Sequence, residues 1–135
     1  MAHEHAVCMM LVDGAAGARD EKVLRRYAPR LEKLARRDDH RLCLAIAHRG
    51  WGVAHRLAGE NAEAEERLSK ARELFQALEA RWQVGRTLYE MAELDLARSD
   101  SAAAFGHFGL ALAAFEALGA APDAERMKRA LADIS

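Results

Sequence analysis

Part of the sequence repeats itself after 40 residues. The segment LFQALEA at residues 74–80 aligns with AFEALGA at residues 114–120, so that Phe, Ala, Leu and Ala fall together. In the same register, small residues also coincide: Gly52 with Ala92, Ala64 with Ala104, and Ala71 with Ala111. A unit this short cannot bury its apolar side chains alone. The repetition therefore predicts units that stack and share one continuous core.

The repeated units are predicted to be helical. Val, Ile and Thr, which favour strands, occur only eight times in 135 residues, whereas Ala, Leu, Arg and Glu are good helix formers. Apolar residues also recur at spacings of three and four, which is typical of amphipathic helices. Such stripes are Leu44-Ala47-Trp51-Ala54-Ala58, Ala64-Leu68-Ala71-Phe75-Leu78, Phe105-Phe108-Leu112-Phe115 and Met127-Ala130-Leu131-Ile134. The fold class is therefore predicted to be all-α.

Short polar or glycine-containing segments separate the stripes, at residues 59–61, 98–101 and 119–123. Each can end one helix and cap the next, which implies antiparallel helix pairs. We expect a single domain over residues 1–135, with units at 1–38, 39–80 and 81–121 and a capping helix at 123–135. In the first unit, Pro29 either kinks the second helix or begins a shorter one.

The small residues carry a resemblance to a known family. Gly52, Ala64 and Ala71, and their counterparts 40 residues later, resemble the tetratricopeptide repeat (TPR), in particular the repeats of about 40 residues in large bacterial signalling and transcription regulators. Over residues 39–122 the resemblance implies antiparallel helix pairs in a short right-handed superhelix of about three pairs plus a C-terminal capping helix. A HEAT-like repeat has a similar period, but alanines seven apart favour the TPR. His55 and Asp95 depart from the family pattern, which has tyrosine there.

Charge and composition disfavour several classes of protein. The net charge is −1 and the pI is about 6.6, so nucleic acid is not an expected partner. The longest uncharged run, residues 101–115, is shorter than the ~18 residues of a membrane span. No export signal is visible at the N-terminus, so a cytoplasmic location is expected. Cys8 and Cys43 are expected to be buried thiols.

The sequence offers little catalytic chemistry. It contains no phosphate-binding loop, nucleophile elbow or zinc-protease motif, so we expect no enzyme and no cofactor. Glu90 and Glu93 are interpreted as a solvated helix face. His48 and His55 lie seven residues apart on one helix face. Ordinary packing is the favoured interpretation, and a small-molecule sensor or enzyme using these two histidines is the alternative.

Metal ligands occur close together near the N-terminus. His3, His5 and Cys8 offer imidazole and thiolate groups within one segment, but their spacing matches no structural zinc module. Asp38 and Asp39 lack the alternation of a calcium loop and are interpreted as a helix cap and loop. We therefore expect no built metal site, and whether His3, His5 and Cys8 bind a metal ion adventitiously stays open.

The resemblance also implies a binding surface on the inner helices. A non-catalytic module would bind a protein or peptide there, and the arginines would suit an acidic partner. Homodimerisation through Met127, Leu131 and Ile134 is an alternative function. The residues carried over to the groove are Arg49, Val53, Arg56, Arg86, Tyr89, Glu93, Arg126 and Arg129.

Overall fold

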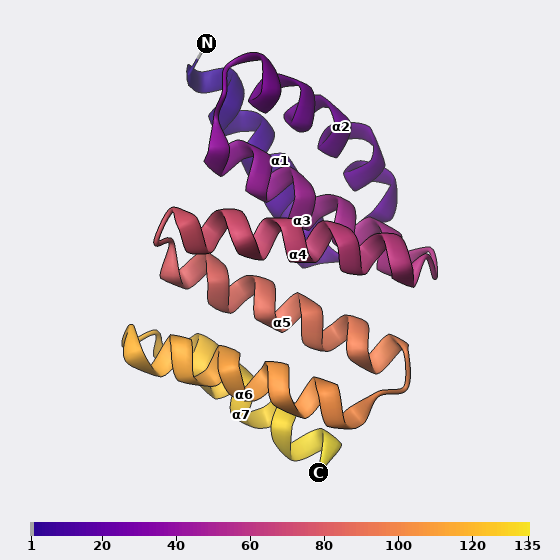
Figure 1. The fold of residues 1–135 in the computed structure, drawn as a ribbon, viewed down its shortest axis with the longest axis vertical. Helices are drawn as coiled ribbons and strands as arrows, with labels where there is room; N and C mark the ends of the chain where they lie inside the picture. The colour runs from indigo at the N-terminus through magenta and orange to yellow at the C-terminus, as the bar shows by residue number, and fades with distance from the viewer. Residues whose placement is uncertain (1) are drawn as a thin grey trace. The chain divides into compact units, whose positions relative to one another are not determined.

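The computed structural model describes residues 2–135, with side chains from His3 onward, so Met1, where the predicted domain begins, lies outside the described residues. The described chain forms seven α-helices and no strand, which confirms the all-α prediction (Figure 1). The helices are α1 (Ala2–Ala18), α2 (Glu21–Arg37), α3 (Arg41–Leu57), α4 (Asn61–Ala77), α5 (Arg81–Ala97), α6 (Ser101–Ala117) and α7 (Ala121–Ile134).

The turns between the helices follow a period of 20 residues. Each of α1 to α6 has 17 residues. After each of these six helices one residue has a positive φ, and the next amide donates a hydrogen bond of 2.8–3.0 Å to a carbonyl five residues back. This is the Schellman closure of a helix end. The 40-residue period of the sequence thus corresponds to two of these 20-residue geometric periods. The positive-φ residues are Arg19, Asp39, Gly59, Glu79, Ser99 and Gly119.

Three of the turns also supply a side-chain cap for the next helix. Asp20 and Asp100 accept hydrogen bonds from the backbone N–H groups of Val23 and Ala103, at 3.2 and 3.0 Å. His40 does the same through Nδ1, which accepts from the N–H of Cys43 at 3.2 Å. These bonds satisfy amides that a helix start leaves without an intrahelical partner.

The chain divides into two compact units, residues 1–74 and 75–135. In the first unit α1, α2 and α3 pack against one another, and α4 packs on α3 (Figure 1). A Cβ at Gly52 would lie 2.6 Å from the Leu68 side chain and 3.4 Å from the carbonyl oxygen of Ala64. The small residues of the repeat therefore do lie where α3 and α4 approach closely.

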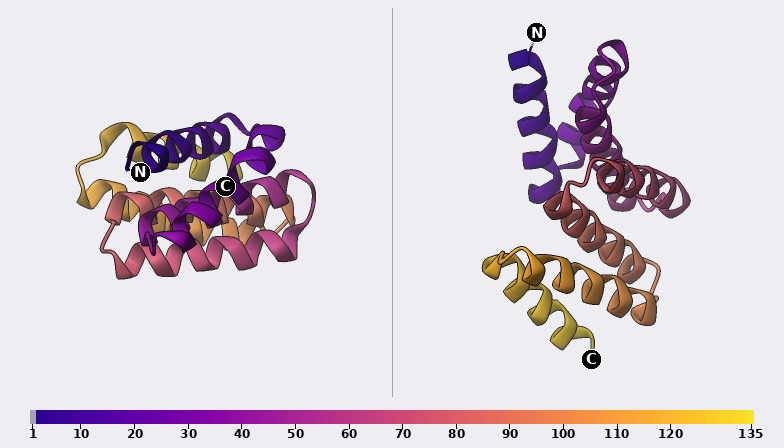
Figure 2. Two further views of the ribbon diagram at one scale, coloured as in Figure 1. Left: turned by 90° about the horizontal axis from the view of Figure 1, so that it is seen from above. Right: turned by 60° about the vertical axis from the view of Figure 1, so that its left-hand side comes forward.

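In the second unit α5, α6 and α7 follow one another as antiparallel neighbours (Figure 2). A Cβ at Gly85 would lie 2.8 Å from the ring of Phe115, so α5 and α6 are also closely packed. The core of this unit consists of Leu88, Ala92, Ala104, Phe108, Ala111, Phe115, Ala124 and Met127.

The structure corrects three expectations about single residues. Phe105, predicted in the buried stripe of α6, is 54% exposed. Met127 is buried, so it cannot belong to an exposed dimerisation flank. Pro29 lies inside the continuous α2, which excludes a shorter helix beginning there.

The right-handed superhelix and the unit boundaries remain predictions. Among the described helices, none is long and apolar enough to cross a membrane.

Candidate functional site

A polar cleft of about 270 Å³ lies among α2, α3 and α4 of the first unit. Both histidines singled out from the sequence, His48 and His55, line it. Its charged groups balance, with three cations and three carboxylates. The lining residues are Glu32, Arg36, His48, His55, Glu63, Glu66, Arg67 and Lys70.

Glu32 is the centre of the hydrogen-bond network in this cleft. Its carboxylate accepts from Trp51 Nε1 at 3.1 Å, from Arg36 Nη2 at 2.9 Å, and from Arg67 Nη1 through both oxygens at 3.1 Å. Burial alone would raise the pKa of Glu32, but the hydrogen bond from Arg36 and the charge of Arg67 outweigh it and lower the pKa. The carboxylate is therefore held ionised between the two guanidinium groups.

His48 is held in the neutral form. Its side chain is buried, and Arg67 Nη1 donates to its Nδ1 at 3.1 Å, so the neutral ring carries its hydrogen on Nε2. Burial, assisted by the charge of Arg67, lowers the pKa of His48 to about 4. A general base works best with a pKa near the working pH. His48 therefore fits a structural role better than proton transfer at neutral pH.

His55 lies at the rim of the same cleft. Its ring stacks on Trp51 with centroids 5.4 Å apart, and its Nδ1 lies 2.8 Å from Oε1 of Glu60. The guanidinium of Arg67 also lies over the Trp51 ring, 5.3 Å from its centroid. Lys70 is likewise paired, with Glu66 at 3.0 Å. Most charges of the cleft are thus already satisfied by neighbouring residues.

The groove residues of the first unit are largely internal. Val53 is fully buried, and Arg49 is 2% exposed. The Nη2 of Arg49 donates to Oδ1 of Asp13 at 3.0 Å, so this guanidinium joins α3 to α1. Arg56 is half-buried on the last turn of α3. Of the three, Arg56 alone has a partly exposed side chain.

In the second unit Arg86, Tyr89 and Glu93 are half-buried on α5. Arg86 Nη1 donates to Oε2 of Glu90 at 2.5 Å, and its guanidinium lies 5.1 Å from the Tyr89 ring centroid. Glu90 is fully buried, so its interpretation as part of a solvated face was wrong. The predicted acid-binding arginine therefore already has a carboxylate partner within the chain.

The last two groove residues, Arg126 and Arg129, are exposed on α7. Arg126 Nη2 donates a hydrogen bond to Oδ1 of Asp123 one turn earlier. Asp123 also accepts from Trp82 Nε1 at 3.0 Å, which joins α7 to α5. A role for any groove residue in partner binding remains a prediction.

The outer faces of α2, α4 and α6 differ sharply in chemistry although their burial patterns match. Six exposed positions recur at the same register in each helix. In α2 all six are basic, in α4 two are acidic, one is basic and three are uncharged, and in α6 Glu116 is the one charged residue among the six. They are Lys22, Arg26, Arg30, Lys33, Arg36 and Arg37 in α2, Ala62, Glu66, Lys70, Glu73, Gln76 and Ala77 in α4, and Ala102, Gly106, Leu110, Ala113, Glu116 and Ala117 in α6.

The outer face of α6, defined here as Ala102, Phe105, Gly106, Gly109, Leu110, Ala113 and Ala117, is the most apolar of the three. Phe105 is 54% exposed and Leu110 is 51% exposed. A Cβ at Gly106 or Gly109 would meet no heavy atom within 4 Å. The uncharged run at residues 101–115, too short to span a membrane, was the sequence signal for this face.

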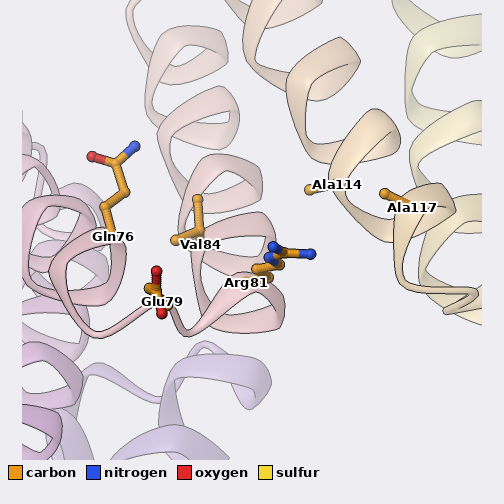
Figure 3. Close-up of a pocket in the computed structure, with 6 residues that line it drawn as sticks. All are labelled: Gln76, Glu79, Arg81, Val84, Ala114 and Ala117. Atoms are coloured by element: carbon orange, nitrogen blue, oxygen red, sulfur yellow. The ribbon is translucent and has the colours of Figure 1, made fainter.

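A pocket of about 460 Å³ adjoins the C-terminal end of the same face (Figure 3). Ala114 and Ala117 of α6 form one wall, and Val84 of α5 adds a further apolar surface. Arg81 and Glu79 bring opposite charges to the rim, as Figure 3 shows. Ala117 belongs to both the pocket and the outer face, so the two surfaces are continuous.

Sequence reasoning did not find the residues that organise the cleft. Glu32 and Arg67 are 35 residues apart and become neighbours only when α2 and α4 both pack near α3. Surface charges of this kind are common on helices, so their spacing carried no distinguishing information.

The fold defines the class of the protein, an all-α helical repeat-like arrangement in which six 17-residue helices and a shorter last helix are joined by turns of two or three residues. No protein-family model, curated protein or solved structure significantly matches the chain.

Proposed function

We propose that the chain is a non-catalytic protein-interaction module of the TPR kind, and that it binds an apolar helix of a protein partner on the outer face of α6. The observation that carries the proposal is the apolar outer face of α6, where Gly106, Leu110 and Ala113 occupy exposed positions that are charged in both α2 and α4.

Two features support the TPR assignment. The 40-residue period of the sequence agrees with the structure, because a pair of helices with its two turns occupies about 40 residues. Small residues lie at the approach of α3 to α4, as the repeat pattern implies, with Gly52 against Ala64 and Leu68. A place within a larger signalling or transcription regulator follows from the same resemblance.

Exposed apolar surface at α6 points to a partner. Exposed single apolar residues are ordinary, but contiguous apolar patches mark interaction sites. Phe105 and Leu110 lie five residues apart, and between them are two glycines where nothing blocks a close approach. An opposing helix could therefore come close to the α6 backbone and contact both large side chains.

The dimensions of the face favour a single helix over a second copy of the chain. From Ala102 to Ala117 the strip is about 22 Å long, and one helix is about 10 Å wide. Stable dimers bury roughly 800 Å² on each partner, which exceeds a strip of that size. Recognition of an amphipathic helix requires a surface of these smaller dimensions.

The test uses a displayed library of amphipathic helical peptides, selected against the full chain. The double variant F105E/L110K gives α6 the residues that α4 has at Glu65 and Lys70. We expect it to weaken binding of the selected peptides at least tenfold. The control R26E/R30E alters the exposed face of α2 and should leave their affinity unchanged.

Equal affinity of the selected peptides for wild type and F105E/L110K would refute binding on α6. Concentration-dependent dimerisation that F105E/L110K abolishes would show instead that a second copy occupies the face. Circular dichroism of both variants establishes that the helices are retained.

Small-molecule binding is a second candidate function, favoured by the cleft that His48 and His55 share. A ligand there would have to compete with ion pairs such as Arg67 with Glu32. The test adds metabolite-like compounds to the chain and follows the NMR signals of the His48 and His55 imidazole rings. His55→Ala is the matched variant. Shifts of both imidazole resonances by the same compound support this function, and none across the screen would exclude it for the compounds tested.

A further inference from the structure

Three metal-binding side chains meet in the first unit, although they form no recognisable motif in the sequence. One ligand atom from each of His5, His40 and Cys43 lies within 4.8 Å of the others. His5 belongs to α1, His40 caps α3, and Cys43 lies in the first turn of α3. Cys43 is fully buried, His5 is 9% exposed, and His40 is half-buried. The cluster therefore combines a protected interior with one accessible side.

We propose that His5, His40 and Cys43 form a binding site for a zinc ion. Two imidazoles and one thiolate are a donor set that zinc accepts, and three protein ligands leave a fourth position for water or another ligand. Zinc bond lengths of about 2.0–2.3 Å place tetrahedral ligand atoms roughly 3.3–3.7 Å apart. Because the donor atoms lie within 4.8 Å of one another, each pair needs to close by about 1.5 Å at most.

The surroundings of His5 already resemble those of a metal ligand. Its Nε2 lies 2.7 Å from Oδ2 of Asp38, so the ring donates to the carboxylate and its Nδ1 keeps a lone pair. Arg37 holds that carboxylate in turn, with Nε and Nη2 each donating at 2.8 Å. A carboxylate behind a histidine is the usual arrangement that orients the ring and raises its basicity toward a metal.

His40 links the site to the folding of α3. In the structure Nδ1 accepts the N–H of Cys43, which fixes the neutral ring with its hydrogen on Nε2. Coordination through either ring nitrogen requires this cap bond to be given up, either directly or by moving the hydrogen to Nδ1. The Cys43 thiol releases its proton to solvent as the zinc–sulfur bond forms, so uptake increases with pH.

The site differs from the group suggested by the sequence. His5 is common to both, but His3 and Cys8 are replaced by His40 and Cys43, which lie more than 30 residues away in sequence. Cys8 has another contact, its thiol donating to the carbonyl oxygen of Tyr27 at 3.8 Å. His3 and Cys8 therefore serve as matched controls, because they offer the same chemistry nearby.

The test titrates the reduced full chain with Co²⁺, which reports thiolate coordination by a near-ultraviolet charge-transfer band. Wild type should show the band with one equivalent of metal, and Zn²⁺ should displace it. Cys43→Ser and His5→Gln should lose the band or weaken binding at least tenfold. His40→Asn is the sharpest variant, because asparagine keeps the N-cap while removing the imidazole. His3→Gln and Cys8→Ala should bind as wild type does.

Absence of the band in wild type, with no change in its thermal unfolding on adding Zn²⁺, would overturn the site. Unchanged metal binding by His40→Asn would do so too, and loss of the band in His3→Gln or Cys8→Ala would assign the metal to other residues. Circular dichroism identifies any variant that is unfolded. If His5→Gln is unfolded, Asp38→Asn tests the same side of the site. It should weaken metal binding while leaving all three ligands in place.

Discussion

Individual turn residues show how strictly the repeat geometry is imposed. Six residues at intervals of 20 have positive φ, yet only Gly59 and Gly119 are glycines. Side chains with a Cβ are strained in this region, at a cost of order 1–3 kcal/mol. The Schellman bonds and the packing of the flanking helices must hold the other four residues there.

Replacing Ser99 by glycine is therefore expected to stabilise the chain, by up to about 1 kcal/mol, because glycine adopts a φ of 60° without the steric penalty. Gly119→Ala, at a φ of 69°, should cost about 1 kcal/mol. Chemical denaturation of both variants beside wild type measures the free energies of unfolding. The same sign of change for the two would contradict the account.

His48 makes the stability of the first unit depend on pH. Its folded pKa of about 4 lies below the ordinary value of 6.5, so the unfolded chain takes up a proton that the folded chain refuses. The favourable contribution of neutral His48 is therefore complete above pH 6.5 and is lost as pH falls toward 4. The difference of about 2.5 pKa units corresponds to roughly 3 kcal/mol.

His48→Gln should remove this part of the pH dependence while keeping an acceptor for Arg67. Between pH 6.5 and 4 we expect wild type to lose on the order of 3 kcal/mol more unfolding free energy than the variant. Urea denaturation at a series of pH values measures both curves. Curves that run parallel over this range would show that His48 is protonated in the folded chain.

Among the helices, glycine has opposite effects depending on what its backbone faces. At Gly85 of α5 the backbone lies against the ring of Phe115, whereas at Gly106 of α6 it faces open space. Both positions are inside helices, where glycine costs about 1 kcal/mol relative to alanine. Packing against Phe115 must therefore offset that cost at Gly85, whereas nothing offsets it at Gly106.

Gly85→Ala is expected to destabilise the second unit by about 1–3 kcal/mol, because its Cβ would lie 2.8 Å from the Phe115 ring. Gly106→Ala gains helix propensity without a clash and should stabilise by up to about 1 kcal/mol. Thermal unfolding of the two variants compares them directly. A stabilising effect of Gly85→Ala would show that α5 and α6 are less closely packed than described.

The helices themselves could be predicted from the sequence, because apolar spacing and the 40-residue register both depend on local pattern. Gly52 was predicted at a helix crossing, since it coincides with Ala92 in that register. The exposed position of Phe105 was not, because a uniformly apolar helix has no preferred face to identify. Burial of Glu90 with Arg86 depends on tertiary packing, which their spacing alone does not distinguish from a surface pair.

At the scale of the molecule, one scaffold carries three kinds of surface. Equivalent exposed positions are basic on α2, of mixed charge on α4 and, apart from Glu116, uncharged on α6, while the buried positions beneath them stay apolar. The cleft at His48 and the cluster at His5 were not predictable, because each joins residues from helices far apart in sequence. Repetition determines the helices, and departures from it at exposed positions distinguish the candidate binding face.

The most direct measurement of the central claim is an NMR map of the full chain bound to a selected helical peptide. Binding on the outer face of α6 predicts amide shift changes and intermolecular contacts concentrated at residues 102–117, with Phe105 and Leu110 contacting the peptide. Changes concentrated instead around Arg56, or around Arg86 and Tyr89, with residues 102–117 unaffected, would contradict it and favour the inner groove.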